Sequence, residues 1–299
     1  MKYSLVILRY GEIALKSKYV RKKFENILIK NIKFALNNEK IENKIEKERG
    51  RIYIYTSKVE PTCNVLKRII GIVNFSPAVK TDSKIESLSK TSIDFSKKYL
   101  KKDISFALRV TRTGNQPYNS QFIKEKIGND IVNKYGSKVD LTNPDFKLYI
   151  EIRSDSSYIF NKKILGVGGM PVGSQDKVLC IIKDKFSILA SWYLLKRGCG
   201  LVFLVKKDFD LKLLKSFLKK WYIKDDIIFF NESKDFYKKI NDLTSKKDCK
   251  AIITDFYNLN EENIQEIKQY KKEIKVPTLH PLIFMNENEL NEKIKEIGL

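Results

Sequence analysis

The stretch Gly166-Val167-Gly168-Gly169-Met170-Pro171-Val172-Gly173 is the part of this 299-residue chain richest in glycine and proline. Both residue types interrupt regular secondary structure, so we expect a domain boundary here. On its N-terminal side, short strands and helices are mixed in the manner of α+β domains. On its C-terminal side, strands and helices alternate regularly, which predicts a doubly wound parallel sheet of the α/β class. The stretch therefore separates two fold classes.

The N-terminal half predicts small α+β units. Within residues 1–75, apolar runs and helical periodicity follow the order β-α-β-α-β, which is typical of a ferredoxin-like domain. Residues 76–165 continue with two helices, a strand and a hairpin. The strands expected in this half are 3–8, 51–56, 71–79, 104–110, 146–152 and 157–164. The helices expected there are 18–38, 61–70, 85–100 and 120–135.

After a linker at residues 166–176, the C-terminal part of the sequence has a different pattern of expected strands and helices. Apolar runs of four to six residues alternate with helical patterns over residues 177–299, which favours a parallel sheet covered by helices. The expected strands are 178–182, 200–205, 227–230 and 251–254. The expected helices are 186–196, 211–221, 234–243, 261–270 and 287–297.

The charge of the chain points to a polyanionic partner. Its 58 Lys and Arg outnumber 36 Asp and Glu, for a net charge of +22. Residues 1–171 carry 34 Lys and Arg against 17 Asp and Glu, so +17 of that charge precedes the end of the linker. A generally lysine-rich composition would explain the total but not this asymmetry. The distribution favours a nucleic-acid surface in the N-terminal half.

Several classes of site and location are disfavoured by composition. The four cysteines, Cys63, Cys180, Cys199 and Cys249, form no C-x-x-C pair, which fits a reduced cytoplasmic setting and argues against a cysteine-rich metal site. The single histidine, His280, argues against a histidine metal site or a Ser-His-Asp triad. No apolar run reaches the roughly 18 residues of a membrane helix, and the first residues lack the features of a signal peptide. We expect no membrane partner.

Five motifs connect this chain to a family. In collinear order they are residues 10–17 (YGEIALKS), 109–114 (RVTRTG), 139–145 (VDLTNPD), 168–175 (GGMPVGSQ) and 278–283 (TLHPLI). Together they resemble the tRNA 4-thiouridine synthetases, or tRNA sulfurtransferases. The resemblance implies a ferredoxin-like domain at 1–75, a THUMP domain at 76–165 that holds the tRNA acceptor end, and a PP-loop domain of Rossmann-like fold at 177–299. It also implies a homodimer.

The candidate tRNA-binding residues fall into two groups. RNA recognition needs cations for the backbone, and donors and stacking groups for single-stranded ends. The first group surrounds one loop and the helix after it: Arg109, Arg112, Tyr118, Lys124 and Lys126. The second group, expected to make secondary contacts, lies near the N-terminus: Lys16, Lys18, Arg21 and Lys22. Ordinary solvated helix faces would give the same patterns, and the family resemblance favours RNA binding.

The nucleotide loop is where the chain departs from the family. The family's PP-loop reads Ser-Gly-Gly-x-Asp-Ser, whose small residues let backbone N–H groups hold pyrophosphate. Here the corresponding residues are Lys183-Asp184-Lys185-Phe186-Ser187, in which both glycines are missing and only Ser187 matches. We interpret Lys183, Asp184, Lys185 and Ser187 as a vestigial nucleotide loop, with no cofactor. ATP and Mg are the alternative.

Two further departures concern adenylation and sulfur transfer. Residues 253–257 stand where the family has a segment containing Thr-Gly-Glu, and the resemblance implies a sulfur-carrying cysteine beyond Leu299. Sulfur transfer needs a cysteine with a low pKa. Cys180 lies in an expected buried strand, and Cys199 and Cys249 could meet across neighbouring strands. His280 stands where the family often has Arg, and either core packing or a polar contact is expected for it.

The leading hypothesis is a tRNA-binding member of the family that contributes to tRNA thiolation without ATP-dependent catalysis of its own. A separate PP-loop or sulfur-carrier protein would then be a partner. One alternative is an active ATP-dependent tRNA 4-thiouridine sulfurtransferase. The other is a THUMP-bearing subunit of another tRNA modification enzyme. The sequence leaves open whether the chain is itself an enzyme.

Overall fold

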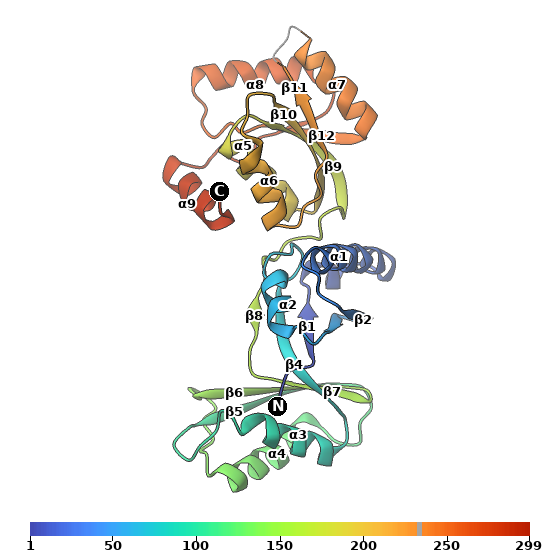
Figure 1. Ribbon diagram of the computed structural model, residues 1–299, viewed down its shortest axis with the longest axis vertical. Helices are drawn as coiled ribbons and strands as arrows, with labels where there is room; N and C mark the ends of the chain where they lie inside the picture. Colours follow the sequence, from blue (N-terminus) through green and yellow to red (C-terminus); the bar gives the residue numbers. More distant parts are fainter. Residues whose placement is uncertain (232–234) are drawn as a thin grey trace. The chain divides into compact units, whose positions relative to one another are not determined.

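The computed structural model describes residues 1–231 and 235–299 (Figure 1). The chain forms two compact units, each built from segments that are separate in sequence. The first unit comprises residues 1–9, 36–67 and 74–165, and the second comprises 10–35, 68–73 and 166–299. In the described part of the chain, no helix has the length and apolar character needed to cross a membrane.

The first unit is built on one sheet of eight strands. Along the sheet their order is β2-β3-β1-β4-β7-β6-β5, with β8 paired to β4. The strands are β1 (Leu5–Arg9), β2 (Lys44–Glu48), β3 (Arg51–Tyr55), β4 (Asn74–Asp82), β5 (Phe106–Thr113), β6 (Phe146–Arg153), β7 (Ser156–Phe160) and β8 (Ile164–Leu165). Its helices are α2 (Val59–Leu66), α3 (Ile85–Ser96) and α4 (Ser120–Tyr135).

Strand β4 joins the ferredoxin-like and later parts of this sheet. Its first residues, Asn74–Ala78, pair with β1, and Val79–Asp82 pair with β7. Side chains alternate along β6, so that Leu148 and Ile150 enter the core beneath α3 and α4. Tyr149 and Glu151 consequently lie on the opposite face.

The second unit contains a parallel sheet of order β11-β10-β9-β12-β13. Its strands are β9 (Gln175–Ile182), β10 (Cys199–Lys206), β11 (Ile227–Phe230), β12 (Cys249–Ile253) and β13 (Thr278–Leu279). Its helices are α5 (Lys185–Lys196), α6 (Leu211–Lys220), α7 (Phe236–Lys247), α8 (Glu261–Glu273) and α9 (Glu287–Ile297), preceded by the 3-10 turn η1 (Glu12–Leu15) and most of α1 (Lys18–Asn38).

Both faces of the parallel sheet are covered (Figure 1). Cys180 and Ile182 of β9 pack in the core that includes α5, α6 and α9. Leu179 and Ile181 point the other way and pack with α7 and α8. The strand order reverses at β9, so the crevice between the carboxyl ends of β9 and β12 is where such folds bind ligands.

The predicted fold class is confirmed, and the differences are local. Strand β2 was not predicted, because its sequence KIEKE is mostly exposed at the sheet edge and pairs with β3 alone. Strand β4 begins at Asn74 rather than at Gly71, whose φ of +104° belongs to a turn. Helix α7 begins at Phe236, and the expected start at Lys234 lies outside the described residues.

Candidate nucleic-acid interface

Arg112 organises the polar loop that follows β5. Its Nη1 donates hydrogen bonds to the carbonyl of Gly114 at 3.0 Å and to Oε1 of Gln116 at 3.1 Å. Gln116 in turn donates to the carbonyl of Ser154 at 3.0 Å, which ties the loop to the β6–β7 turn. These hydrogen bonds hold the loop in shape. Arg112 is nevertheless exposed, so it remains accessible to a ligand.

Tyr118 and Lys126 of the first predicted group make internal contacts. The hydroxyl of Tyr118 donates to the carbonyl of Ser83. The ammonium of Lys126 lies 2.7 Å from Asp130 one helical turn away. Each therefore has a partner within the unit.

Arg109 and Lys124 are brought together at a cavity of about 490 Å³ beside β5 and β6. We call this cavity the cationic pocket. Its charged lining consists of Arg9, Arg51, Arg109, Lys124, Lys163 and Glu151. Tyr149 and Phe160 form part of its wall. Arg109 is steadied by a hydrogen bond of 2.8 Å from its Nη2 to the carbonyl of Leu141.

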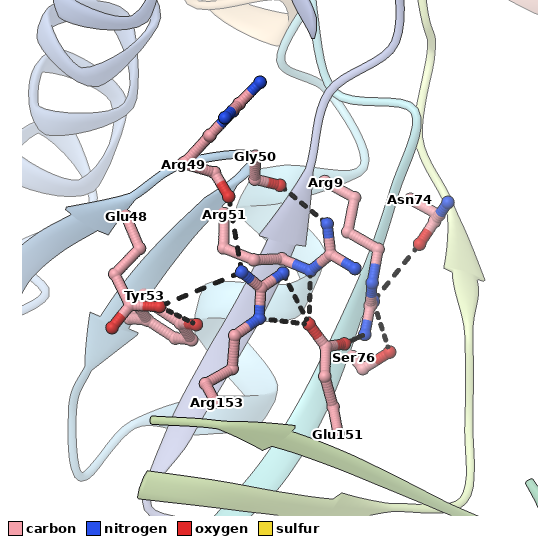
Figure 2. Close-up of polar contacts among 10 residues, drawn as sticks. All are labelled: Arg9, Glu48, Arg49, Gly50, Arg51, Tyr53, Asn74, Ser76, Glu151 and Arg153. Atoms are coloured by element: carbon pink, nitrogen blue, oxygen red, sulfur yellow. Dashed lines mark hydrogen bonds and ion pairs between the residues drawn. The ribbon is translucent and has the colours of Figure 1, made fainter. Parts of the chain in front are cut away.

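Glu151 is the centre of an arginine cluster next to this pocket (Figure 2). Its carboxylate accepts from Arg9 at 2.9 Å, Arg51 at 2.6 Å and Arg153 at 3.1 Å. Arg9 also donates to Ser76 at 3.0 Å. Arg9 and Arg51 come from β1 and β3, whereas Glu151 and Arg153 come from β6, so the cluster joins two parts of the first unit.

The electrostatics of the cluster are those of a carboxylate surrounded by excess positive charge. Burial alone would raise the pKa of Glu151, but the charges of Arg51 and Arg9 outweigh it and leave that pKa below its usual value. The pKa of Arg9 is lowered, first by burial, despite the opposing effect of Glu151. Glu151 is therefore ionised and neutralises only part of the charge around it.

Sequence reasoning missed Arg9, Arg51, Lys163 and Glu151. These residues are far apart in the chain, and only the strand order on either side of β4 brings them to one place. The usable signal was Arg9, which ends an apolar strand, whereas Glu151 falls in the polar phase of the alternating strand β6 and has no distinguishing pattern. A buried charge in a strand predicts an opposite charge near it.

The second predicted group lies in the second unit. Lys16, Lys18 and Lys22 are exposed around η1 and the start of α1, and Arg21 lies 4.0 Å from Glu25. The side chain of Tyr19, beside them, is 81% exposed and was not predicted. An exposed aromatic ring among cations is a suitable surface for stacking a base.

The loop of Lys183, Asp184, Lys185 and Ser187 caps its own helix. Asp184 accepts from the backbone N–H of Ser187 at 2.9 Å, and Ser187 Oγ accepts from the N–H groups of Lys183 and Asp184, both at 3.0 Å. These bonds form a capping box at the start of α5. A side-chain carboxylate thus occupies the helix terminus at which PP-loops hold phosphate.

Further contacts lie beyond this cap. Lys183 lies 3.4 Å from Glu266, and Phe186 packs against Tyr257 with ring centroids 5.4 Å apart. Burial raises the pKa of Asp255, at the end of β12, to about 6. The residues around this cap therefore include acidic and aromatic groups as well as Lys183 and Lys185.

The cysteines show no activated thiol. Burial raises the pKa of Cys180 and Cys199, and raises that of Cys63 and Cys249 to about 11. The expectation that Cys199 and Cys249 meet across neighbouring strands is wrong, because β9 lies between β10 and β12. Within residues 1–231 and 235–299, no group of three His, Cys, Asp or Glu could hold a metal.

His280 makes polar contacts. Its Nδ1 lies 2.6 Å from Thr254 Oγ1, and its Nε2 lies 3.3 Å from Thr278 Oγ1. Of the two expectations for this residue, a polar contact is confirmed.

The comparisons with known proteins agree with this architecture. Residues 5–76 match the ThiI ferredoxin-like domain, and residues 83–161 match the THUMP domain. With the parallel α/β sheet that follows, these matches define a THUMP-domain protein. Two probable tRNA sulfurtransferases align with it, from Methanobrevibacter smithii (32% identity, 100% of this chain, 87% of the relative) and Methanocaldococcus jannaschii (31%, 98% and 87%).

The chain belongs to the tRNA sulfurtransferase family, which confirms the resemblance drawn from its motifs. Among solved structures, PH1313 from Pyrococcus horikoshii superposes with a TM-score of 0.86 at 32% identity, covering 99% of this chain and 100% of that one. A 4-thiouridine synthetase–RNA complex with bound ATP has the same fold, with a TM-score of 0.80 at 24% identity and coverage of 99% and 85%.

Proposed function

We propose that this protein binds the acceptor end of tRNA through its THUMP domain and contributes to tRNA thiolation without ATP-dependent catalysis of its own. The observation that carries the first half is the cationic pocket, in which five cations face one carboxylate. Family relatives are named tRNA sulfurtransferases, and a protein of the same fold was solved with RNA. Phosphate backbones are bound by such surpluses of Lys and Arg.

The second half of the proposal rests on the self-capped loop. The three N–H groups of Lys183, Asp184 and Ser187 are engaged by Asp184 and Ser187 themselves. Pyrophosphate would have to displace a carboxylate and would then meet the bulky ring of Phe186. We therefore propose that the protein needs no cofactor and that a separate PP-loop or sulfur-carrier protein supplies the chemistry. We also propose that the protein is cytoplasmic and forms a homodimer.

The second candidate is an active ATP-dependent sulfurtransferase. It is favoured by the match to relatives of that name along the whole chain. Isothermal titration of Mg-ATP into the protein separates the two candidates, with tRNA titrated into the same preparation as proof that it is functional. The proposal expects heat from tRNA and none from ATP. Micromolar ATP binding that is lost in Ser187→Ala would favour the active enzyme.

The acceptor-end claim has its own test. Filter binding at several salt concentrations compares intact tRNA with tRNA lacking its unpaired 3′ nucleotides. We expect weaker binding of the shortened tRNA, and a fall of affinity with salt in both cases. Equal affinity for the two RNAs would contradict acceptor-end recognition. Light scattering of the free protein tests the homodimer.

A further inference from the structure

A cavity of about 500 Å³ lies within the second unit, at the amino ends of its parallel strands. We call it the amino-end pocket. Lys177 near the start of β9, Gly200 near the start of β10 and Asp226 directly before β11 line one side of it. A strand advances by about 3.3 Å per residue, so the six residues from Lys177 to Lys183 place the loop before α5 about 20 Å away. The amino-end pocket is therefore separate from the crevice at the carboxyl ends of the strands, where such folds bind ligands.

The walls of the amino-end pocket are apolar and partly aromatic. Phe34 of α1 contributes one ring, and Trp221 and Tyr222, directly after α6, contribute two more. Other apolar residues of the wall are Ile27, Ile69, Leu201 and Ile223. Gly173 also lines the pocket, and a Cβ at this position would meet no atom within 4 Å, so the pocket is open there. Small-molecule sites combine such apolar walls with a few charged groups.

Tyr222 has a backbone conformation that is unusual for its residue type. Its φ is +53°, in the left-handed region that favours glycine. Its N–H donates to the carbonyl of Lys219 at 3.3 Å, and the N–H of Ile223 donates to that of Leu218 at 2.9 Å, which is the Schellman arrangement at a helix end. Arg68 fixes the ring, because its Nη2 donates to the Tyr222 hydroxyl at 2.5 Å and its guanidinium lies 4.8 Å from the ring centroid. Strained residues of this kind are concentrated at binding sites, so the anchored ring indicates a wall of fixed shape.

Three exposed lysines at this pocket have no acidic partner. They are Lys30, Lys177 and Lys224, and within the residues that the structure describes none of them makes an ion pair. The ammonium of Lys224 lies 5.3 Å from the centroid of the Phe34 ring. Cations beside an apolar and aromatic wall complement a ligand that carries both an anionic group and a flat ring.

The charge balance of the amino-end pocket favours one phosphate over a polyphosphate. Two aspartates line it, Asp225 and Asp226, and Asp226 is already paired with Lys247 at 2.8 Å. The three lysines exceed the remaining aspartate by two charges. One phosphate monoester, with a charge of about −1.5 to −2 at pH 7, would balance this surplus. The absence of a free arginine fork in this lining favours phosphate, which lysine binds as a point charge, over a carboxylate.

We propose that the amino-end pocket binds a small molecule in which a flat aromatic ring is joined to a single phosphate. The phosphate is bound by the three unpaired lysines, and the ring lies against the aromatic wall. The site belongs wholly to the second unit and is independent of the proposed function. Mononucleotides and phosphorylated flavins share this chemistry, so the test includes one of each.

The test measures binding of AMP and of FMN to the full-length protein by equilibrium dialysis. Adenosine and riboflavin are the matched ligands, because each lacks only the phosphate. We expect at least one monophosphate to bind at micromolar concentration, and its matched ligand to bind at least about tenfold more weakly. Whether AMP or FMN binds more tightly identifies the kind of ring that the pocket accepts.

Protein variants show whether the ligand occupies the amino-end pocket. Lys30→Met, Lys177→Met and Lys224→Met should each bind the monophosphate about tenfold more weakly than the wild type. Lys23→Met is the control, since Lys23 is exposed on the same helix as Lys30 but does not line the pocket. We expect the control to bind as the wild type does. Unchanged binding in all three pocket variants would place the ligand elsewhere and overturn the proposal.

Other outcomes would overturn it as well. One is the absence of binding of both monophosphates up to about 1 mM. Another is complete displacement by inorganic phosphate at constant ionic strength, which would reduce the pocket to a simple anion site. A third is displacement of the monophosphate by tRNA, which would make the pocket part of the RNA surface. The tRNA and Mg-ATP titrations of the proposed function do not use these variants, so failure here would leave that function intact.

Discussion

Replacing Glu151 tests how much of the first unit depends on one buried carboxylate. The side chain is 5% exposed and pairs with three guanidinium groups, of which Arg9 and Arg153 are also largely shielded from solvent. In Glu151→Ala these cations lose their counter-charge while staying buried. Breaking a buried pair by removing one partner costs about 3–5 kcal/mol. Since domains are stable by only about 5–15 kcal/mol, the first unit should become marginal.

The contribution of Glu151 to the stability of the first unit depends on pH with a definite sign. Because the pKa of Glu151 is lowered from 4.5 in the folded protein, the unfolded chain binds the proton more readily. The stability that ionised Glu151 contributes is fully present above about pH 4.5. It is lost as the pH falls through the lower pKa that Glu151 has in the folded protein. Glu151→Gln has no such titration. The stability difference between wild type and Glu151→Gln should therefore narrow as the pH falls below 4.5.

Hydrogen exchange by mass spectrometry is the suitable assay, because it reports on β1, β3 and β6 separately. Trp192 and Trp221 both lie in the second unit, so their fluorescence during urea unfolding serves as an internal reference. Glu48→Gln is the control, since Glu48 is 48% exposed and lies 4.0 Å from Arg153, a pair worth at most about 1 kcal/mol. If Glu151→Ala accelerates exchange no more than Glu48→Gln does, the argument from buried charge is wrong.

Three other predictions concern the second unit. Asp184→Ala should lower the stability of this unit by about 1 kcal/mol in urea unfolding followed by tryptophan fluorescence. Asp184→Asn keeps an N-cap acceptor and should remain close to the wild type in stability. Equal losses of stability in the two variants would show that capping is not the cause. Gly198→Ala should cost more than about 1 kcal/mol in the same assay, because φ is +91° and a Cβ would lie 2.5 Å from a serine hydroxyl oxygen. With a thiol reagent at mildly alkaline pH, half-buried Cys199 should react before fully buried Cys180, and simultaneous labelling would contradict their different burial.

The parts of the fold that sequence predicted are those with strong local patterns. Helix α4 was predicted at its observed bounds from its apolar periodicity, and in the structure Asn119 caps its start and Gly136 in a left-handed conformation ends it. The apolar run of β9 likewise identified a buried central strand. Strand β2 was not predicted because a charged edge strand has no apolar periodicity. Its pairing with β3 is seen only in the tertiary structure.

The site was less predictable for the same reason. Arg109 and Lys124 were named from one loop and helix, and they do line the cationic pocket. Their neighbours Arg9, Arg51 and Glu151 come from strands whose adjacency depends on the full sheet order. Arg112 was predicted only as a candidate tRNA-binding residue, and its hydrogen bonds to Gly114 and Gln116 show a role in shaping the loop that the sequence did not predict.

Under the proposed function, the loop before α5 illustrates why a single substitution would not give it a phosphate site. In a PP-loop, glycines let several N–H groups converge on the ligand. Here the N–H of Ser187 is satisfied by Asp184, and the N–H groups of Lys183 and Asp184 are satisfied by Ser187 Oγ. Removing the carboxylate of Asp184 would free one donor and leave the other two engaged. Asp184→Gly alone should therefore not create ATP binding, and under the proposed function uridine activation must come from a separate protein.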